Sequence, residues 1–429
     1  MKNITYLFVP SNDSHVQWMI PIAELLDDSH FMVIPTRNEN AELTLLNLGK
    51  SFFEYSPDIF YQIQPRVLIM GNDWSPEELL ILIQAKANNI FTVCIQEGSL
   101  FYPDKVQRLR NADCLFALGN KTKEHFNHPY TIVTGNPKFD QYSPQPFPDN
   151  PKIMVNLNFT YGVEERNRDL WLSGVADALS SGDVEYFISA HPRQKTDDLE
   201  VPCPVIRSNA FSTKKQIEES TLLISRFSTL IYEAVAAGRK VIYYNPHNEP
   251  FVLFHGGYDG VIYEVKSQSQ LREIIHQILN SPRIDEIVWN DFMEYHLGTS
   301  KRDSAVRCAH ALQNLQLNRI QNNLSELIFQ SHQIQIDLIK AKKWLEGQYF
   351  SLSTEVERLQ KAVEEKDGWI GELQQAKEWL AGQHEALRGE VERLQKENKD
   401  QILYIHSMEQ EFTKLKSFTY YLRFKFRKK

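Results

Sequence analysis

Short apolar segments alternate with amphipathic segments along residues 1–316 of the chain. The first apolar run, Ile4–Val9, is followed by His15–Leu26, which carries apolar residues at helical spacing. Apolar runs without polar alternation indicate strands buried on both faces, and the helical segments between them indicate a parallel sheet covered by helices. Further runs of this kind are Phe31–Ile34, Val67–Met70, Phe91–Ile95, Cys114–Leu118 and Thr131–Val133.

A proline-rich segment divides this pattern into two parts. Four prolines lie between Tyr142 and Pro151, a density that is typical of linkers. The pattern then starts again, so we predict two doubly wound, Rossmann-like α/β domains with a ligand site in the cleft between them. The strands predicted for the second domain are Ile153–Leu157, Tyr186–Ala190, Pro204–Arg207, Leu222–Ser225, Val241–Tyr244 and Gly260–Tyr263.

The composition changes near residue 317, and the chain contains no proline from there to its last residue. This stretch is predicted to be helical throughout, and the segment Ala341–Lys361 is repeated as Ala376–Lys396. Leucine at d with valine or isoleucine at a favours a parallel coiled coil, so we expect a homodimer or other parallel oligomer. A single solvated helix would leave the leucine stripe in water. The d positions are Leu338, Leu345, Leu352, Leu359, Leu373, Leu380, Leu387 and Leu394.

Composition and charge exclude several classes of protein. The 429 residues include 42% hydrophobic residues, which is too many for a wholly disordered chain. The net charge of −8 gives no reason to expect nucleic-acid binding. The four cysteines lie far apart, which argues against a disulfide framework or zinc knuckle and fits a reducing cytosol. No segment approaches the ~20 apolar residues of a spanning helix.

The last residues, 414–429, contain seven Lys or Arg and no acidic residue. Large apolar side chains, including Phe418, Tyr421 and Phe424, alternate with these charges. Basic and aromatic residues together suit the headgroups of an anionic bilayer, so we expect peripheral attachment to a membrane surface. A solvated basic tail or a nucleic-acid contact is the alternative. The predicted regions are therefore 1–142 and 152–316 as domains, 143–151 as linker, 317–413 as coiled coil and 414–429 as tail.

Two candidate chemical groups come directly after predicted strands. Glu97 precedes Gly98, which lets the chain turn, so its carboxylate would stand at the carboxyl edge of the sheet and accept a proton from a hydroxyl. His191 can donate to a phosphate or protonate a leaving group, and Arg193 adds positive charge nearby. The alternatives are a helix-capping or solvent-exposed glutamate and an exposed turn histidine.

A strand, a hydroxyl-rich turn and a helix follow one another in residues 222–238. The strand ends at Ser225, and the helix is predicted to begin at about Ser228. Free N–H groups at a helix N-terminus and the hydroxyls of Ser225, Ser228 and Thr229 predict a phosphate site. Glu233, one turn into the helix, is placed to accept from ribose hydroxyls. Ordinary N-capping by Ser228 and a helix-surface glutamate are the alternative.

Two weaker candidates follow other strands. The segment Ser11–His15 is either an acceptor-side loop or a helix cap with His15 facing solvent. His247 and Glu249 follow Val241–Tyr244 and either contact a donor or cap a turn.

The order of these motifs resembles the nucleotide-binding half of the GT-B glycosyltransferases, over about residues 1–315. It is most similar to enzymes with CMP- or CDP-linked donors: bacterial GT-B sialyltransferases, capsule Kdo transferases and CDP-glycerol glycerophosphotransferases. Sialyltransferases carry an acidic-acidic-Gly motif with the base, and His-Pro and Ser-Ser/Thr motifs that contact the CMP phosphate. Here the matching residues are Glu97-Gly98, with Gln96 in place of one acid, His191-Pro192 and Ser228-Thr229. The segment Thr134–Asp140 resembles the Gly-x-Pro-x-x-Asp turn of the CDP-glycerol transferases.

This resemblance implies a metal-independent glycosyltransferase that moves a sugar or polyol phosphate from a CMP- or CDP-linked donor to a cell-surface glycan, carried on a lipid in some cases. It implies no cofactor beyond the donor, and a cytoplasmic enzyme at the inner face of the membrane. A nucleotide-sugar 2-epimerase-like enzyme and a non-catalytic GT-B scaffold stay open as alternatives. The implied catalytic residues are Glu97 and His191, and the implied donor-binding residues are Arg193, Ser225, Ser228, Thr229 and Glu233.

Overall fold

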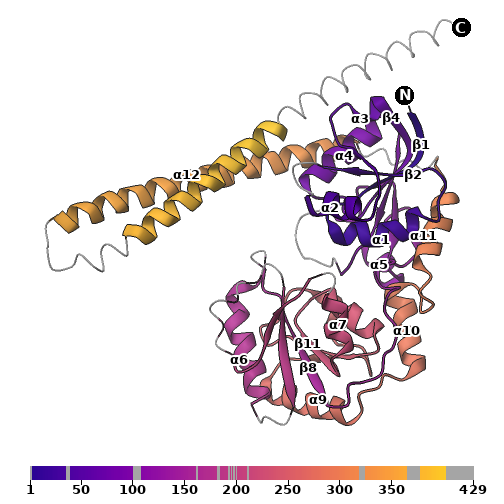
Figure 1. The fold of residues 1–429 in the computed structure, drawn as a ribbon, viewed down its shortest axis with the longest axis vertical. Coiled ribbons are helices and arrows are strands. Elements are labelled where there is room, and N and C mark those ends of the chain that lie inside the picture. Colours follow the sequence, from indigo (N-terminus) through magenta and orange to yellow (C-terminus); the bar gives the residue numbers. More distant parts are fainter. Residues whose placement is uncertain are drawn as a thin grey trace, which may run out of the picture.

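Two α/β domains and a projecting helical hairpin make up the computed structural model (Figure 1). Arg193 and the basic-aromatic tail 414–429 lie outside the described residues. In the part of the chain that is described, no helix is both long and apolar enough to cross a bilayer. The described residues are 2–34, 39–99, 108–160, 163–180, 184–191, 194, 196, 199, 201–209, 212–317, 324–364 and 377–401.

The first domain is built on a parallel sheet in the order β3-β2-β1-β4-β5-β6-β7. Its strands are β1 (Lys2–Val9), β2 (Ser29–Val33), β3 (Phe52–Glu54), β4 (Ile63–Met70), β5 (Phe91–Ile95), β6 (Cys114–Ala117) and β7 (Thr131–Val133). Its helices are α1 (Asp13–Ala23), α2 (Glu39–Asn47), α3 (Ile59–Gln62), α4 (Pro76–Ala87) and α5 (Asn120–Phe126).

Both faces of this sheet are buried, which explains the continuous apolar runs of its strands. Alternate residues of β1 point to opposite faces: Leu7 and Val9 join the core that α4 covers, whereas Tyr6 and Phe8 join the core that α1 covers. The polar residues that follow the strands are thereby left at the carboxyl edge of the sheet, facing the second domain.

The second domain has a parallel sheet in the order β10-β9-β8-β11-β12-β13. Its strands are β8 (Lys152–Leu157), β9 (Glu185–Ala190), β10 (Val205–Arg207), β11 (Leu222–Ser225), β12 (Lys240–Tyr244) and β13 (Ile262–Val265). Its helices are α6 (Arg168–Ala178), α7 (Ser212–Glu218), α8 (Leu230–Ala236) and α9 (Gln268–Asn280), with 3-10 turns at Glu165–Asn167 and Val252–Phe254. The GT-B-type pair of doubly wound domains expected from the sequence is confirmed.

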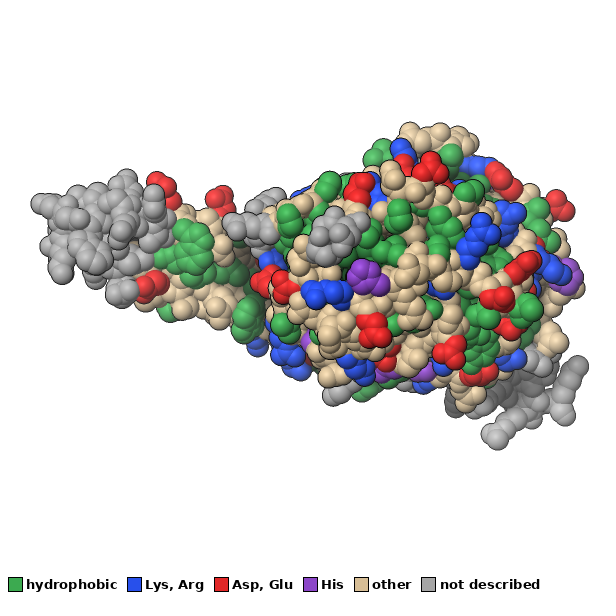
Figure 2. Space-filling model, turned by 90° about the horizontal axis from the view of Figure 1, so that it is seen from below, with side chains coloured by type: hydrophobic (Ala, Val, Ile, Leu, Met, Phe, Trp, Pro, Cys, Tyr) green, Lys and Arg blue, Asp and Glu red, His purple; other side chains and the backbone are tan. Residues whose placement is uncertain are grey.

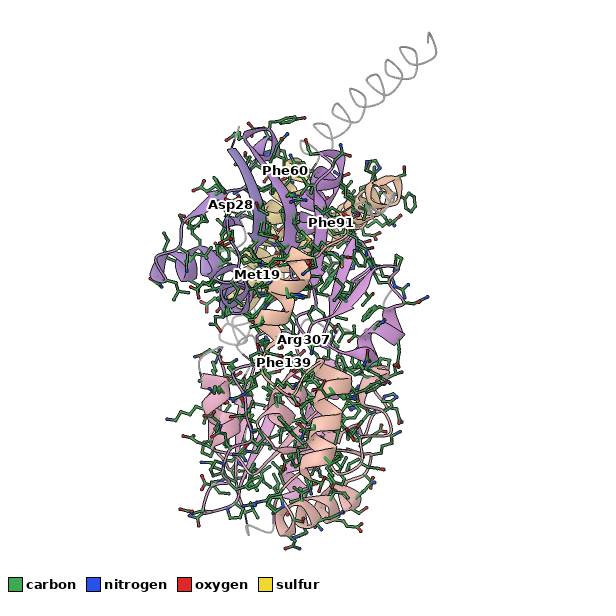
Figure 3. All side chains as sticks on the ribbon, turned by 90° about the vertical axis from the view of Figure 1, so that its right-hand side faces the viewer. Met19, Asp28, Phe60, Phe91, Phe139 and Arg307 are labelled. Carbon is green, nitrogen blue, oxygen red and sulfur yellow. The ribbon has the colours of Figure 1, made fainter. Side chains whose placement is uncertain are left out.

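The chain returns to the first domain after the second sheet, along α10 (Glu286–Leu297) and α11 (Ser304–Gln313). Nη2 of Arg307 donates to the Val133 carbonyl oxygen at 3.0 Å, and the apolar face of α11 packs into the first-domain core. Figure 3 shows Arg307 at the level where the two domains meet. The expected second domain, 152–316, therefore ends too late, because α11 belongs to the core of the first domain.

The C-terminal helices form a hairpin rather than one continuous helix. Helix α12 (Leu324–Glu364) is anchored on the first domain by the fully buried Leu327, and helical residues 377–401 run back along it (Figure 1). The rings of Tyr349 and His384, which occupy equivalent positions of the two repeats, have centroids 3.8 Å apart. Figure 2 shows the hairpin projecting beyond the domains.

The d leucines that the structure describes are all buried or half-buried and form the seam of this hairpin. Leu380 and Leu394 are only 5% and 3% exposed. The expectation of an uninterrupted helix is therefore wrong, because the two described helical stretches lie antiparallel within one chain. Formation of an oligomer stays a prediction.

Candidate functional site

A cavity of about 1030 Å³ lies between the two domains. The first domain contributes the start of α1 and Ser99 to its walls, and the second contributes residues that follow β8, β9 and β11. The succession of strands in the second sheet reverses between β8 and β11, and open α/β sheets bind ligands at such switch points. Of the predicted residues, His191, Ser228, Thr229 and Glu233 line this cavity.

Glu97 follows β5 and is held by two residues at the start of α1. Ser14 Oγ donates to its Oε1 at 3.1 Å, and His15 Nε2 lies 2.9 Å from its Oε2. The backbone N–H of Ser11 donates to His15 Nδ1 at 3.2 Å, which assigns the ring proton to Nε2 and makes it the donor to Glu97. The side chain of Glu97 is 29% exposed, beside Ser14 in the cavity wall.

His15 is buried, which excludes the alternative in which its side chain faces solvent. The capping expected for this loop is present, because the Asn12 side chain accepts from the His15 backbone N–H at 2.9 Å. This cap fixes the first turn of α1. The position of that turn then determines where the His15 imidazole contacts Glu97.

The surroundings of Glu97 stabilise its ionised form. Burial raises the pKa of this carboxyl, but His15, Lys138 and the Ser14 hydrogen bond outweigh burial and lower the pKa to about 2. Glu97 is therefore an oriented carboxylate at neutral pH, able to accept a hydrogen bond from a hydroxyl group in the cavity.

Gln96, which stands in place of one acid of the motif, has a structural role. Its Nε2 donates to the Gly98 carbonyl oxygen at 2.8 Å, while its Oε1 accepts from the Leu118 backbone N–H at 3.0 Å. An ionised carboxylate has no hydrogen to donate to Gly98. The amide thus shapes the turn that presents Glu97.

The turn after Glu97 touches the start of α8 in the second domain. The Ser99 backbone N–H donates to Thr229 Oγ1 at 3.1 Å, and a Cβ atom on Gly98 would lie 2.3 Å from the same oxygen. Gly98 is therefore required here for close approach of the two domains.

The hydroxyls predicted to hold phosphate lie at the cavity, although the helix differs from expectation. Helix α8 begins at Leu230, not at Ser228, and spans only seven residues. Ser228 Oγ accepts from the Leu230 backbone N–H at 3.2 Å, and Thr229 Oγ1 is engaged by Ser99. Both side chains line the cavity, so their hydroxyls, more than a helix dipole, would meet a ligand.

Two predicted donor contacts have other partners. Ser225 is fully buried, where its Oγ accepts from Asn156 Nδ2 at 2.9 Å and donates to the Arg226 carbonyl oxygen. The Glu233 carboxylate accepts from Tyr142 OH at 2.6 Å and pairs with Lys138 Nζ at 3.0 Å. Ser225 therefore faces the sheet, and the Glu233 carboxylate, at the cavity wall, is already paired with two residues near the end of the first domain.

His191 follows β9 as predicted, and its backbone N–H donates to the Leu157 carbonyl oxygen at 3.0 Å. Its partner in the motif, Pro192, and the predicted donor residue Arg193 lie outside the described residues. In the described part of the chain, no cluster of three or more His, Cys, Asp or Glu side chains is arranged to hold a metal ion.

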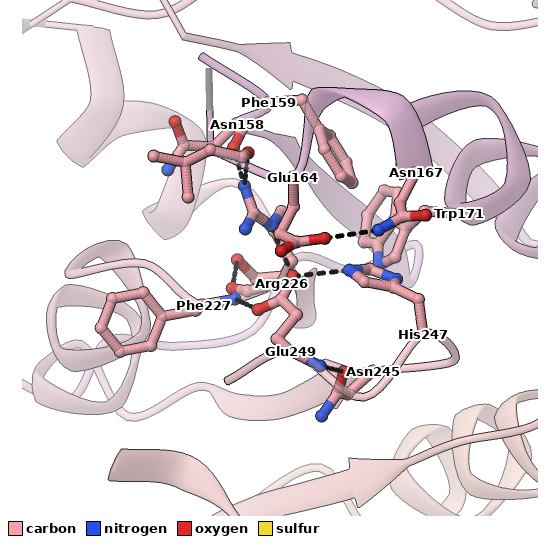
Figure 4. Close-up of polar contacts among 12 residues, drawn as sticks. Asn158, Phe159, Glu164, Asn167, Trp171, Arg226, Phe227, Asn245, His247 and Glu249 are labelled. Atoms are coloured by element: carbon pink, nitrogen blue, oxygen red, sulfur yellow. Dashed lines mark hydrogen bonds and ion pairs between the residues drawn. The ribbon is translucent and has the colours of Figure 1, made fainter. Parts of the chain in front are cut away.

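The sequence patterns did not single out Arg226, which lines the cavity and pairs with Glu249. The available signal was its place directly after a buried strand at the middle of the second sheet. Glu249 was considered together with His247, whose Nε2 lies 3.1 Å from Glu249 Oε1 (Figure 4).

Neither a scan against protein-family models nor a search of curated proteins found a match. Among solved structures, the chain is similar to UDP-GlcNAc 2-epimerase from Neisseria meningitidis bound to UDP-GlcNAc, with 12% identity, TM-score 0.54 and coverage of 73% of this chain and 100% of the other. A putative UDP-N-acetylglucosamine 2-epimerase from Listeria monocytogenes gives 12% identity, TM-score 0.54 and coverage of 73% and 96%.

The UDP-GlcNAc 2-epimerase from Methanocaldococcus jannaschii in complex with UDP-GlcNAc and UDP gives 12% identity, TM-score 0.51 and coverage of 73% and 99%. At this level of identity the likeness concerns the fold. Together with the two sheets and the cleft between them, it places the first 316 or so residues in the GT-B fold.

Proposed function

We propose that the chain is a glycosyltransferase that moves a sugar or polyol phosphate from a nucleotide donor, CMP- or CDP-linked, to a hydroxyl of a cell-surface glycan. One observation carries this proposal. An oriented carboxylate, Glu97, stands beside the first-domain wall of a cavity whose second-domain wall presents His191, Ser228 and Thr229. A base on one side and phosphate-binding donors on the other are what transfer between two substrates needs.

In this mechanism the acceptor hydroxyl donates to Glu97, which takes its proton as the hydroxyl oxygen bonds to the anomeric carbon, or to phosphorus where a polyol phosphate moves. The bond from that centre to the leaving phosphate breaks, and negative charge builds on the phosphate oxygens. His191 and the hydroxyls of Ser228 and Thr229 would stabilise that charge by hydrogen bonding. His15 holds the Glu97 carboxylate and would help to stabilise it through the reaction.

A nucleotide-sugar 2-epimerase-like reaction is the second candidate. It is favoured by the structural neighbours, whose names describe 2-epimerases with UDP-GlcNAc or UDP bound. The two reactions differ in one requirement, because an epimerase converts its donor without any acceptor.

The test is incubation of the full chain with CMP-, CDP- and UDP-linked sugars, with and without a glycan acceptor. Release of nucleotide that depends on acceptor supports the transferase, and conversion of the sugar without acceptor supports the epimerase. Binding of nucleotide without either reaction would support the non-catalytic scaffold. For a transferase, His191→Ala and Ser228→Ala should each lower kcat/KM at least tenfold, equivalent to about 1.4 kcal/mol of transition-state stabilisation.

The place of action proposed for this enzyme is the inner face of the cytoplasmic membrane. The support is the composition of residues 414–429, with seven basic residues and no acid, which suits an anionic surface on which a lipid-carried glycan would grow. Co-sedimentation with anionic and neutral liposomes tests this. Removal of the residues after Gln410 should abolish recovery in the anionic pellet, and equal recovery of both chains would exclude the tail as the anchor.

A further inference from the structure

Arg226 is a buried arginine at the switch point of the second sheet. It directly follows β11, the neighbour of β8, and it is among the residues that line the cavity, although it is only 2% exposed. An arginine this buried must be held by compensating partners.

The partners of Arg226 fix its guanidinium in one orientation (Figure 4). Nε pairs with Glu249 Oε1 at 2.5 Å, and Nη1 donates to the carbonyl oxygens of Asn158 at 2.8 Å and Val163 at 3.1 Å. The guanidinium carbon lies 4.6 Å from the ring centroid of Phe159. The group therefore has no freedom to swing away from the cavity edge.

Glu249 is itself held, so the anchor of Arg226 is rigid. Its Oε2 accepts from the Phe227 backbone N–H at 3.2 Å and from Tyr243 OH at 3.3 Å, and its Oε1 also contacts His247 Nε2 at 3.1 Å. Burial raises the pKa of Glu249, but His247 and Arg226 outweigh burial and lower it, so the carboxylate is ionised and its charge compensates that of Arg226.

Nη2 of Arg226 differs from the other two guanidinium nitrogens in its hydrogen bonding. It is buried, and among the described residues it has no hydrogen-bond partner. Arg239, in the same domain and also fully buried, shows the usual situation, because its Nη1 donates to Gln145 and its Nη2 donates to Pro146 and Glu218, all through carbonyl oxygens. A buried donor left without an acceptor is costly, so the unpaired Nη2 of a cavity-lining arginine indicates an acceptor supplied by a ligand.

We propose that Arg226 binds a phosphoryl oxygen of the donor nucleotide through Nη2. This inference rests on the proposed function and defines its ligand class as a nucleoside monophosphate or diphosphate. The planar guanidinium suits a phosphate oxygen, and Arg226 lines the same cavity as Ser228 and Thr229, which follow it closely in the chain. Glu249 acts as a positioning residue that holds the guanidinium.

Calorimetry tests this with cytidine, CMP, CDP, uridine and UDP as probes. The full wild-type chain should bind at least one nucleotide at least tenfold more tightly than its nucleoside. Arg226→Gln should lose most of that ratio while nucleoside affinity stays within about twofold. Arg239→Gln is the matched control, because it removes an equally buried arginine away from the cavity and should keep the wild-type ratio.

Replacing Arg226 alone leaves the buried Glu249 charge without its partner, which destabilises the fold. The double variant Arg226→Gln/Glu249→Gln is therefore included, because it removes both charges. A folded double variant that keeps the wild-type preference for nucleotide over nucleoside would overturn the proposal. Equal loss of the ratio in Arg239→Gln would also overturn it, since the effect would then be global. A wild-type chain that binds none of the probes would instead refute the nucleotide donor of the proposed function.

Discussion

Replacing Gly98 with alanine examines the contact that brings Glu97 to the second domain. The added Cβ atom would lie 2.3 Å from Thr229 Oγ1 and 2.8 Å from Thr229 Cγ2, far inside ordinary contact distances. Gly98 is not among the described glycines with positive φ, so alanine meets no backbone strain and the cost is steric. Overpacking of this kind costs about 1–3 kcal/mol, which is the loss we expect in the free energy of unfolding.

Thr229 cannot simply turn away, because its Oγ1 bonds to the Ser99 backbone N–H and lies 3.1 Å from Ser99 Oγ. The Gly98→Ala chain therefore either loses these bonds or holds its domains further apart. Urea unfolding followed by circular dichroism measures the first effect, and small-angle X-ray scattering measures the second as a larger radius of gyration.

Two further variants separate the steric contact from a general effect of alanine. Gly347→Ala is the control, because a Cβ atom there meets nothing within 4 Å and alanine in a helix should stabilise by up to about 1 kcal/mol. Thr229→Ala removes the two atoms that lie nearest to the added Cβ atom. The double variant Gly98→Ala/Thr229→Ala should therefore regain more than half of the unfolding free energy that Gly98→Ala loses. Additive effects of the two substitutions, or a Gly98→Ala chain as stable as wild type, would refute the contact.

Three other expectations follow from the structure. Glu97→Gln should leave nucleotide affinity unchanged and lower kcat, measured by steady-state kinetics; an unchanged kcat with a changed acceptor KM would make Glu97 a binding residue. Burial, with a smaller contribution from Lys121, lowers the pKa of His296 from 6.5 to about 3. The unfolded chain then takes up a proton that the folded chain does not, so the free energy of unfolding should fall by about 1.4 kcal/mol per pH unit below 6.5, and His296→Gln should flatten that slope. Ultracentrifugation of the full chain and of residues 1–317 tests oligomer formation, and a monomeric full chain at micromolar concentration would exclude it.

The strands were predictable because a parallel sheet buries both of its faces. Phe91–Ile95 and Leu222–Ser225 have the bounds expected from their apolar runs, since every residue of each is buried. The edge strand β3 (Phe52–Glu54) was missed, because it is short and only half-buried and so leaves no continuous apolar signal. Burial on both faces thus decides which strands a sequence reveals.

The candidate site was predictable only where position along a strand determines position in space. The positions of Glu97 and His191 at the edges of their sheets were predictable because each follows a strand, and parallel strands end at one edge of a sheet, whereas their roles stay predictions. The contact of His15 with Glu97 was not predictable, because the two residues are 82 positions apart and their pairing depends on how α1 packs. The contacts of Ser225 and Glu233 were not predictable for the same reason, since no spacing indicates that Asn156 and Tyr142 contact their side chains.

The C-terminal repeat shows that a heptad pattern defines a buried face without defining its partner. The same a and d residues are covered whether the two repeats pair within one chain or between chains. Pairing within the chain costs loop closure, which grows only slowly with the number of residues between the paired segments. Association of two chains costs at least about 4 kcal/mol in lost motion before any contact forms. If the seam contacts are of equal quality, the hairpin is therefore favoured over the dimer. A dimer needs contacts beyond the seam. Trp344 and Trp379 are available for such contacts, because they are 63% and 64% exposed at equivalent positions of the two repeats.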